Sequence, residues 1–391
     1  MNTAAMIVAL AHLIYVPAIP LVKDELGVSA GSVAWTIAAF TISQSVAQVL
    51  VGPMADRTNG ARLLRIGLVL FLVSNALILA VPTLTGLMAG RIITGFGAGM
   101  VTGAGYALVA QANSVGKGRE RALAVYQAII AVGAVAGPSS GAAIVALTGR
   151  WEYVFLILLG ASAVALVISC VLPPPAVEFQ APSPQEMWLA ARHRGVLVMA
   201  LVSGIVGVAI MTMHSSLAFV LDDGDLPAQW MDSVGFAMIP CGVLTGSMLV
   251  GHLLQRFEGR VLLTAALVWL AVVISVFGVV QQWTGASLWL FPLLFASGLG
   301  LGAGMALSIG VATSLASSSP GTVSAVVVVS RNIGTTVAPF VVGVAYDLDN
   351  LWGAYLVAVA AIVVAGALSA AWTRRSARNE AEAVALATGP V

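Results

Sequence analysis

Charged side chains are scarce in this sequence. Its 391 residues include 17 basic and 16 acidic ones, which make up 8% of the chain, whereas 60% of the residues are hydrophobic. A soluble domain carries about a quarter charged residues. The composition therefore excludes a soluble globular domain and predicts an integral membrane protein.

Cysteines and catalytic motifs are scarce as well. Cys170 and Cys241 both lie in apolar runs, so we expect neither a disulfide framework nor a metal site. A phosphate-binding loop of the GxxxxGK(S/T) type is missing, which excludes ATP-driven transport by this chain alone. An intramembrane enzyme would need a nucleophile–base pair or a metal cluster in its spans, and the sequence offers neither. We predict no enzyme activity, no catalytic residues and no cofactor.

Long apolar runs are what the sequence does contain. A helix needs about 20 residues to cross a bilayer, and continuously apolar runs favour helices over barrel strands, in which polarity alternates. We therefore predict an all-α membrane protein with twelve spans. They lie at residues 4–22, 32–54, 62–82, 84–111, 122–147, 152–172, 195–221, 229–254, 261–281, 286–314, 321–346 and 350–373.

Basic residues gather in every second loop, and Lys and Arg accumulate on the cytoplasmic side of membranes. Both termini are therefore predicted to be cytoplasmic, with only Lys23 and Arg150 on the opposite side. Because a basic stretch and a cleavage site are missing, we expect the first span to be a retained helix rather than a signal peptide. The basic residues on the predicted cytoplasmic side include Arg57, Arg62, Arg65, Lys117, Arg119, Arg121, Arg192, Arg194, Arg256, Arg260, Arg374, Arg375 and Arg378.

The chain repeats itself. The charged turn at 52–65 (GPMADRTNGARLLR) returns at 251–260 (GHLLQRFEGR), the stretch 95–100 (GFGAGM) returns at 300–305 (GLGAGM), and Gly133…Pro138 returns as Gly334…Pro339. Such repeats are typical of transporters, with the substrate site between the halves. We predict an N-terminal six-helix half (1–173), a cytoplasmic linker (174–194), a C-terminal six-helix half (195–373) and a cytoplasmic tail (374–391).

These motifs resemble those of the major facilitator superfamily. The turn at 52–65 is similar to the family's loop between spans 2 and 3, and 91–99 (RIITGFGAG) to its span-4 motif. The stretch 133–141 (GAVAGPSSG) resembles the span-5 motif of the drug:proton antiporter branch, which has twelve spans and exports its substrates. Two departures are Asn59, where the family loop has Gly but Asn tolerates the left-handed conformation, and Ala142, where a final Gly is usual.

The resemblance assigns a gating role to the charged turn, which in the family locks the cytoplasmic side. A carboxylate such as Asp56 can meet the positive end of a neighbouring helix in one conformation and leave it in the other. The alternative is that these charges only set the topology. Because Gln255 replaces Asp56 in the second copy, we expect a weaker second gate. The predicted gating residues are Asp56, Arg57, Arg62, Arg65 and Arg256.

Glycines at four-residue spacing line two spans and predict close helix packing. Pro138 cannot donate a backbone hydrogen bond, so the span at 122–147 is expected to bend there. The family resemblance implies that this bend serves the conformational change or limits proton leak. The residues predicted for packing and bending are Gly95, Gly99, Gly103, Gly133, Gly137, Pro138 and Gly141.

Apart from Glu152 and Asp232 in the first turns of their spans, acidic residues are missing inside the twelve predicted spans, which argues against a specialist for cationic drugs. Charged residues inside spans are costly and are usually functional. Arg91 matches the span-4 arginine that the family implicates in proton coupling. His12 and His214 take similar places in the two halves, and histidine titrates near neutral pH. We predict proton coupling through Arg91, His12 and His214, although a histidine in a span is often just hydrogen-bonded to a neighbour.

The remaining polar residues of the spans are candidates for the substrate site. Arg331 resembles a pattern in drug exporters and could equally bind an anion. The predicted set is Arg331, Asn332, Tyr15, Trp35, Gln44, Gln48, Tyr126 and Gln127.

The preferred hypothesis is a monomeric secondary transporter of the cytoplasmic (inner) membrane that exports small amphipathic neutral or anionic compounds in exchange for protons by alternating access. It has no nucleic-acid partner. An organic-anion transporter that uses Arg331 and Arg91 is the alternative, and a non-transporting receptor or an intramembrane enzyme is a third possibility.

Overall fold

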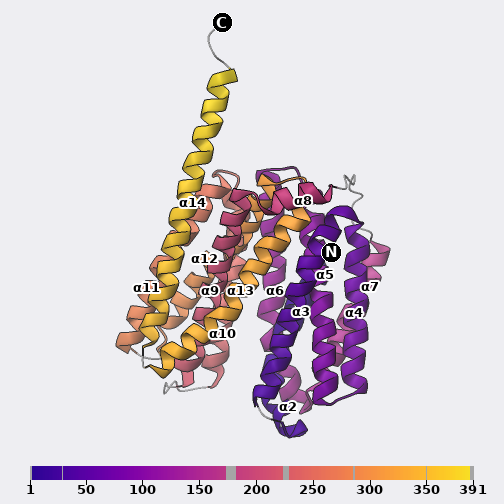
Figure 1. Cartoon of the computed structure of the whole chain (residues 1–391). Coiled ribbons are helices and arrows are strands. Elements are labelled where there is room, and N and C mark those ends of the chain that lie inside the picture. Colours follow the sequence, from indigo (N-terminus) through magenta and orange to yellow (C-terminus); the bar gives the residue numbers. More distant parts are fainter. Residues whose placement is uncertain are drawn as a thin grey trace.

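The protein is a bundle of membrane-spanning helices arranged as two halves of six (Figure 1). The computed structural model describes residues 2–28, 30–172, 182–222, 229–284, 287–348 and 350–387. The first half contains α1 (Asn2–Leu13), the short 3-10 helix η1 (Val16–Ala18), α2 (Ile19–Leu26), α3 (Ala30–Arg57), α4 (Gly60–Ala80), α5 (Leu84–Gln111), α6 (Lys117–Thr148) and α7 (Glu152–Val171). The second contains α9 (Arg194–Asp222), α10 (Gln229–Leu253), α11 (Gly259–Thr284), α12 (Leu290–Leu315), α13 (Pro320–Asp347) and α14 (Leu351–Ala387).

Helix lengths fit a bilayer. Within the described ranges, nine helices are long and apolar enough to cross a membrane, and two shorter apolar helices lie at Asn2–His12 and Ala237–Leu253. Large apolar side chains that point outward, such as Val46 (50% exposed) and Val364 (54% exposed), cover the sides of the bundle. In a soluble protein such a surface would aggregate; here it faces lipid.

Two details differ from the sequence prediction. The first predicted span, 4–22, is interrupted, because helix α1 ends at Leu13 and η1 and α2 follow it. The stretch between the halves contains a helix that was not predicted, α8 (Pro184–Ala191), which lies at the end of the bundle in Figure 1. Its first turn carries a capping box: the Ser183 hydroxyl accepts from the Glu186 backbone N–H, and the Glu186 carboxylate accepts from the Ser183 N–H. This local cap explains a helix of only two turns.

Glycines allow the closest helix contacts, with the same logic in each half. A Cβ added at Gly95 or Gly99 would collide with the α3 backbone, at Phe40 and Gln44. In the second half, Gly298 and Gly302 lie against the α10 backbone in the same way. The packing therefore pairs Gly95 with Gly298, two residues before the partner that the sequence repeat suggested, Gly300.

Gly300 instead faces α11, as Gly97 faces α4. Judged by these glycine contacts, equivalent residues of α5 and α12 are 203 positions apart in the chain, whereas the sequence repeat suggested 205. Gly133 lies against the α1 backbone at Met6, and Gly141 lies against the backbone of Ile14, directly after α1 ends. Helix α6 continues without interruption through position 138, so a bend there stays a prediction.

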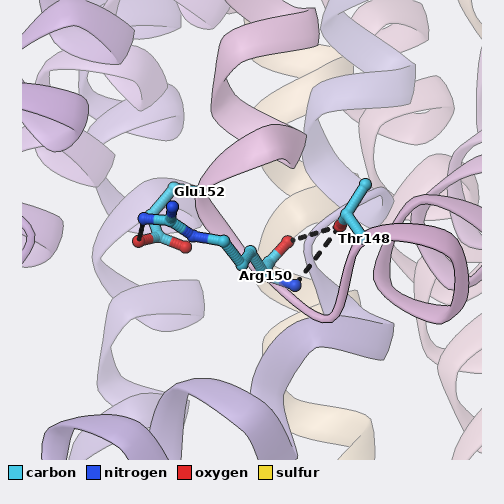
Figure 2. A network of polar contacts seen from close by, with 3 residues as sticks. All are labelled: Thr148, Arg150 and Glu152. Atoms are coloured by element: carbon cyan, nitrogen blue, oxygen red, sulfur yellow. Dashed lines mark hydrogen bonds and ion pairs between the residues drawn. The ribbon is translucent and has the colours of Figure 1, made fainter.

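The end of the bundle opposite α8 carries a small ion pair. The Arg150 guanidinium donates to the Glu152 carboxylate at 2.8 Å, while the Arg150 backbone N–H donates to the Thr148 hydroxyl at 3.3 Å (Figure 2). The hydrogen bond that Arg150 donates to the Glu152 carboxylate raises the pKa of Arg150 above its usual value. Because a carboxylate neutralises it, Arg150 adds little positive charge to this side.

Candidate functional site

The charged turn of the first half closes onto the second half through Asp56. This carboxylate lies at the end of α3 and is 2% exposed. Its two oxygens accept hydrogen bonds from the backbone N–H groups of Gly321 and Thr322, each at 2.6 Å, and from the Thr322 hydroxyl at 2.7 Å. These donors belong to the first turn of α13, where N–H groups lack partners in the helix and the helix dipole is positive. We call Asp56, Gly321 and Thr322 the latch.

A glycine makes the latch possible. Gly52, one turn before Asp56, touches α13 so closely that an added Cβ would lie 2.8 Å from the Gly321 carbonyl oxygen and even nearer to the Ala325 Cβ. Asparagine 59, which follows the latch, has φ −64° and caps α4 by accepting from the Ala61 N–H at 2.9 Å. The left-handed conformation considered for Asn59 is therefore wrong, because its side chain serves as a helix N-cap.

The second copy of the turn is built differently. Helix α10 ends at Leu253, and Gln255, the counterpart of Asp56, is exposed. The contact between the halves comes instead from α6: the buried Arg119 guanidinium donates to the Thr313 carbonyl at 2.8 Å, in the last turn of α12. Carbonyls there lack helical partners and carry the negative end of the dipole. The neighbouring Glu120 packs against Gly259 and Gly310.

A chain of polar side chains crosses between the halves deeper in the bundle. The Asn332 amide of α13 donates to the Ser45 hydroxyl at 3.0 Å and to the Gln48 carbonyl oxygen at 3.1 Å, both on α3. Gln48 is 2% exposed, and its side-chain amide donates a hydrogen bond to the Thr102 hydroxyl of α5 at 3.0 Å. Buried polar groups of this kind are usually paired, and here the hydrogen bonds connect α13 with α3 and α3 with α5.

Arg331 lies next to this chain. It is about 16 Å along α13 by helical rise, and its guanidinium lies close to the Tyr106 hydroxyl of α5. That hydroxyl in turn donates to the Gln127 side-chain oxygen of α6 at 2.7 Å, and the Tyr126 ring stacks edge-on against Tyr106. The Arg331 Nη1 atom is buried and has no hydrogen-bond partner among the described residues. This spare N–H group can donate to an anion or a carbonyl oxygen.

We call these residues the central polar cluster: Ser45, Gln48, Thr102, Tyr106, Gln127, Arg331 and Asn332. Ser45, Thr102 and Tyr106 were not among the predicted site residues. Thr102 and Tyr106 are four residues apart on α5, the spacing that places them on one helix face. That spacing is the feature of the sequence from which Thr102 and Tyr106 could have been predicted as a pair.

Arg91 lies in a separate cluster within the first half. It is fully buried and donates to the Ala11 carbonyl of α1 at 3.1 Å. Its guanidinium lies over the Phe40 ring at 4.4 Å and over the Tyr15 ring at 5.3 Å. The His12 ring meets the same Phe40 ring edge-on at 5.0 Å. The structure therefore brings together Arg91 and His12, both predicted for proton coupling, and adds Tyr15, which had been predicted for the substrate site.

Other predicted residues lie apart from both clusters. His214 of α9 is half-buried, and its Nδ1 bonds the Ile210 carbonyl at 2.8 Å. Trp35 is 63% exposed, and Gln44 is half-buried. Of the predicted gating arginines, Arg65 donates to the Ser169 carbonyl of α7 in its own half, at 2.8 and 3.2 Å. The exposed ones are Arg57, Arg62 and Arg256.

Metal binding finds little support. In the part of the chain that the structure describes, no group of three or more His, Cys, Asp or Glu side chains could hold a metal ion.

The sequence and the fold are similar to those of known proteins. The model of the Major Facilitator Superfamily matches residues 1–339. The chain is 29% identical over 143 residues to the uncharacterized MFS-type transporter EfpA of Mycobacterium tuberculosis. This match covers 37% of this chain and 27% of EfpA. It is 26% identical over 255 residues to the uncharacterized MFS-type transporter YdgK of Bacillus subtilis (63% and 62%), and 29% identical over 157 residues to the quinolone resistance protein NorA of Staphylococcus aureus (40% and 40%). Each match covers less than two thirds of the relative.

Solved structures resemble the whole bundle. The human organic anion transporter MFSD10 superposes with a TM-score of 0.75 at 18% identity, over 94% of this chain and 97% of that one. The transporter FucP in its outward conformation gives 0.76 at 14% identity, over 94% and 96%. At these identities the likeness shows the fold.

Proposed function

The chain belongs to the Major Facilitator Superfamily of membrane transporters, and we propose that it exports small amphipathic neutral or anionic compounds in exchange for protons by alternating access. The observation that carries the proposal is the latch. Asp56 binds the first turn of a helix in the other half with three hydrogen bonds, which is a contact that two rocking halves can make in one state and release in the other. The direction of transport draws support from relatives named for drug resistance, such as NorA.

The central polar cluster is the proposed substrate site. Its members come from α3, α5, α6 and α13, so it spans both halves and would change shape as the halves rock. The sole charged member is Arg331, with an unpartnered Nη1. A substrate that supplies a carbonyl, phenolate or carboxylate oxygen would satisfy that atom, whereas a cation would be repelled.

The proposed proton-coupling site is the cluster of His12 and Arg91. The two side chains lie on one Phe40 ring, so their charges interact at short range. Protonating His12 would place a second positive charge next to Arg91, which is costly in a buried site. Proton binding could thereby drive α1 away from α5. His214, bonded to its own helix, is the second candidate.

Transport assays in proteoliposomes test this proposal. We expect an inside-acidic pH gradient to drive uptake of the anionic dye fluorescein and to leave the cationic dye ethidium unmoved. His12→Gln should lower the gradient-driven rate about tenfold while leaving dye exchange at equal pH intact. The matched control is His252→Gln, because His252 is exposed at the end of α10. Indifference of transport to the gradient would refute proton coupling.

An organic-anion transporter is the second candidate, and the unpartnered Arg331 atom favours it. Here the carboxylate of the substrate would pair with Arg331 itself. Arg331→Ala should then abolish binding of carboxylates and spare neutral compounds, and Arg331→Lys should restore part of the binding. Equal loss of acidic and neutral compounds would count against this candidate. We further propose that the protein works as a monomer in the inner membrane with both termini in the cytoplasm.

A further inference from the structure

A groove on the side of the bundle follows the seam between the halves. Helices α3 and α13 form its walls and α8 closes one end, with Val49, Pro53, Met187, Val329 and Ile333 among the lining residues. It has a volume of about 600 Å³ and is almost entirely apolar. We call it the seam groove. Val49 and Ile333 are 53% and 60% exposed, so the groove opens sideways, toward the lipid.

A smaller hollow of about 360 Å³ continues the groove beyond Pro53 and Met187, which line both. Arg57 and Thr58 line this second hollow. Arg57 is exposed there, and a guanidinium on such a surface binds phosphate oxygens through several N–H donors. The two hollows together offer an apolar channel with a basic, hydrogen-bonding mouth.

Helix α8 shows where this mouth lies in the membrane. Trp188 and Leu189 of α8 are each 61% exposed, and Trp188 is a side chain that settles at the boundary of headgroups and acyl chains. The Arg192 guanidinium lies 5.3 Å from the Trp188 ring, and Arg194 is exposed nearby in sequence. Basic clusters at such a boundary attract anionic lipids.

We propose that the seam groove binds one anionic phospholipid, with its phosphate at Arg57 and an acyl chain along Val49 and Ile333, and that this lipid stabilises the latched state. Charge complementarity selects the anionic headgroup, and the apolar walls select the chain. The site faces the leaflet at the α8 end of the bundle.

The effect on the latch follows from the position of the groove. Its walls belong to different halves, and Thr322, a latch residue, lines it as well. When the latch opens, α3 and α13 separate there and an acyl chain loses contact with one wall. A ligand shifts a two-state equilibrium by the ratio of its affinities for the two states, so a lipid that binds the latched form tenfold more tightly shifts the ratio up to tenfold. This second step rests on the proposed alternating access; the binding step does not.

A comparable groove on the other side of the second half serves as an internal contrast. It lies between α11 and α14, has a volume of about 630 Å³ and is lined by Arg260, Val268 and Trp269. Both of its walls belong to one half, so a lipid bound there moves with that half. We expect its occupancy to leave the latch equilibrium unchanged.

Binding can be measured on the full chain in nanodiscs by fluorescence quenching. The quenching of tryptophan fluorescence by brominated phosphatidylglycerol is compared with that by brominated phosphatidylcholine. The contribution of Trp188 is obtained by subtracting the fluorescence of Trp188→Phe from that of the wild type. We expect several-fold stronger quenching by the anionic lipid. Filling the groove with Val326→Phe/Val329→Phe should remove this quenching, whereas Val363→Phe/Val364→Phe on the exposed face of α14 should not. Arg57→Gln should make the two lipids equal.

Equal quenching by both lipids in the wild type, or quenching that survives the filled groove, would overturn the binding step. If fluorescein relieves the quenching at constant lipid, the groove is a substrate portal, and that result would also overturn the binding step.

The latch step is tested by the distance between spin labels at Thr58→Cys and Ser318→Cys. Phosphatidylglycerol should raise the short-distance population, and Val326→Phe/Val329→Phe should abolish that rise. No change with lipid, despite quenching, would overturn the latch step alone. A transport assay enters neither measurement, so failure of the proposed function is scored separately.

Discussion

The two halves are joined at two places by opposite electrostatics. At the latch, the Asp56 carboxylate of α3 meets the positive N-terminal end of α13. At the other place, the Arg119 guanidinium of α6, which lies outside both charged turns, meets the negative C-terminal end of α12. Both use unpaired backbone groups at a helix end as the partner. A helix end therefore serves as a counter-charge of either sign, and a latch needs no side-chain partner of opposite charge.

The two contacts differ in how completely the charge is hydrogen-bonded. Asp56 is buried with three donors on its two oxygens. Arg119, also buried, donates to the Thr313 carbonyl and has a buried Nε atom without a partner among the described residues. A buried charge stabilises only as far as its hydrogen bonds offset the loss of water. The latch should therefore hold the halves together more strongly than the Arg119 contact, and four substitutions test that ranking.

Asp56→Asn should have the largest effect. The amide keeps one acceptor oxygen, replaces the other by a donor that faces the N–H groups of α13, and removes the charge. Charge-assisted bonds contribute about 1.5–3 kcal/mol each, so we expect the latched-to-unlatched ratio to fall roughly 30-fold. Spin labels at Thr58→Cys and Ser318→Cys, in a Cys170→Ser/Cys241→Ser background, measure that ratio. An unchanged distance distribution would show that Asp56 only sets the topology.

Gly52→Ala should come next. The new Cβ would overlap Ala325 and the Gly321 carbonyl oxygen, so α3 and α13 must move apart, at a cost of about 1–2 kcal/mol. The matched control is Gly251→Ala in the second turn, where the nearest atom, Arg121 Cγ, would be 3.8 Å away. The same spin-label pair should report a shift for Gly52→Ala and none for Gly251→Ala. Equal responses would erase the structural distinction between the turns.

Arg119→Gln should have a smaller effect. It removes the bond to Thr313 and, at the same time, a buried charge that is incompletely hydrogen-bonded, so the two consequences partly cancel. We expect a shift of about 0.5–1 kcal/mol toward separation of α6 from α12. Labels at Lys117→Cys and Ser317→Cys measure it, with Arg121→Gln as the control. A shift as large as that of Asp56→Asn would reverse the ranking.

Gln255→Asp should have the smallest effect, within about 0.5 kcal/mol, as for other exposed substitutions. Restoring the acid of the first turn in the second does not restore a latch, because α10 ends before this position and Gln255 is exposed. Thermal unfolding and the Lys117/Ser317 label pair should both match the wild type. A clear gain in the closed population would mean that a carboxylate at position 255 does bind the first turn of α6.

The long apolar runs predicted the helices well. The span expected at 84–111 is helix α5 with the same bounds, and the others agree within a few residues except two. The first is interrupted, and the last, expected at 350–373, continues as α14 to Ala387 through most of the predicted tail. Periodic apolar patterns are local, so they can be read from a window of the chain. The contacts of Asp56 with Gly321 and Thr322 join residues 265 and 266 positions apart, and a local pattern carries no information about such partners.

Sequence by itself determined the membrane class, the twelve spans and the repeat, and its family motifs pointed to Asp56 as a gating residue. Composition and hydrophobic periodicity suffice for these, because the bilayer imposes one solution, the helix, on every long apolar run. Only the tertiary structure decided which ends meet: Asp56 caps α13, and Arg119 of α6 binds the end of α12 while Gln255 stays exposed. It also placed Arg331 near Tyr106, and Arg91 and His12 on one Phe40 ring. Those pairings depend on how whole helices pack, and close packing is a property of surfaces that are distant in the chain.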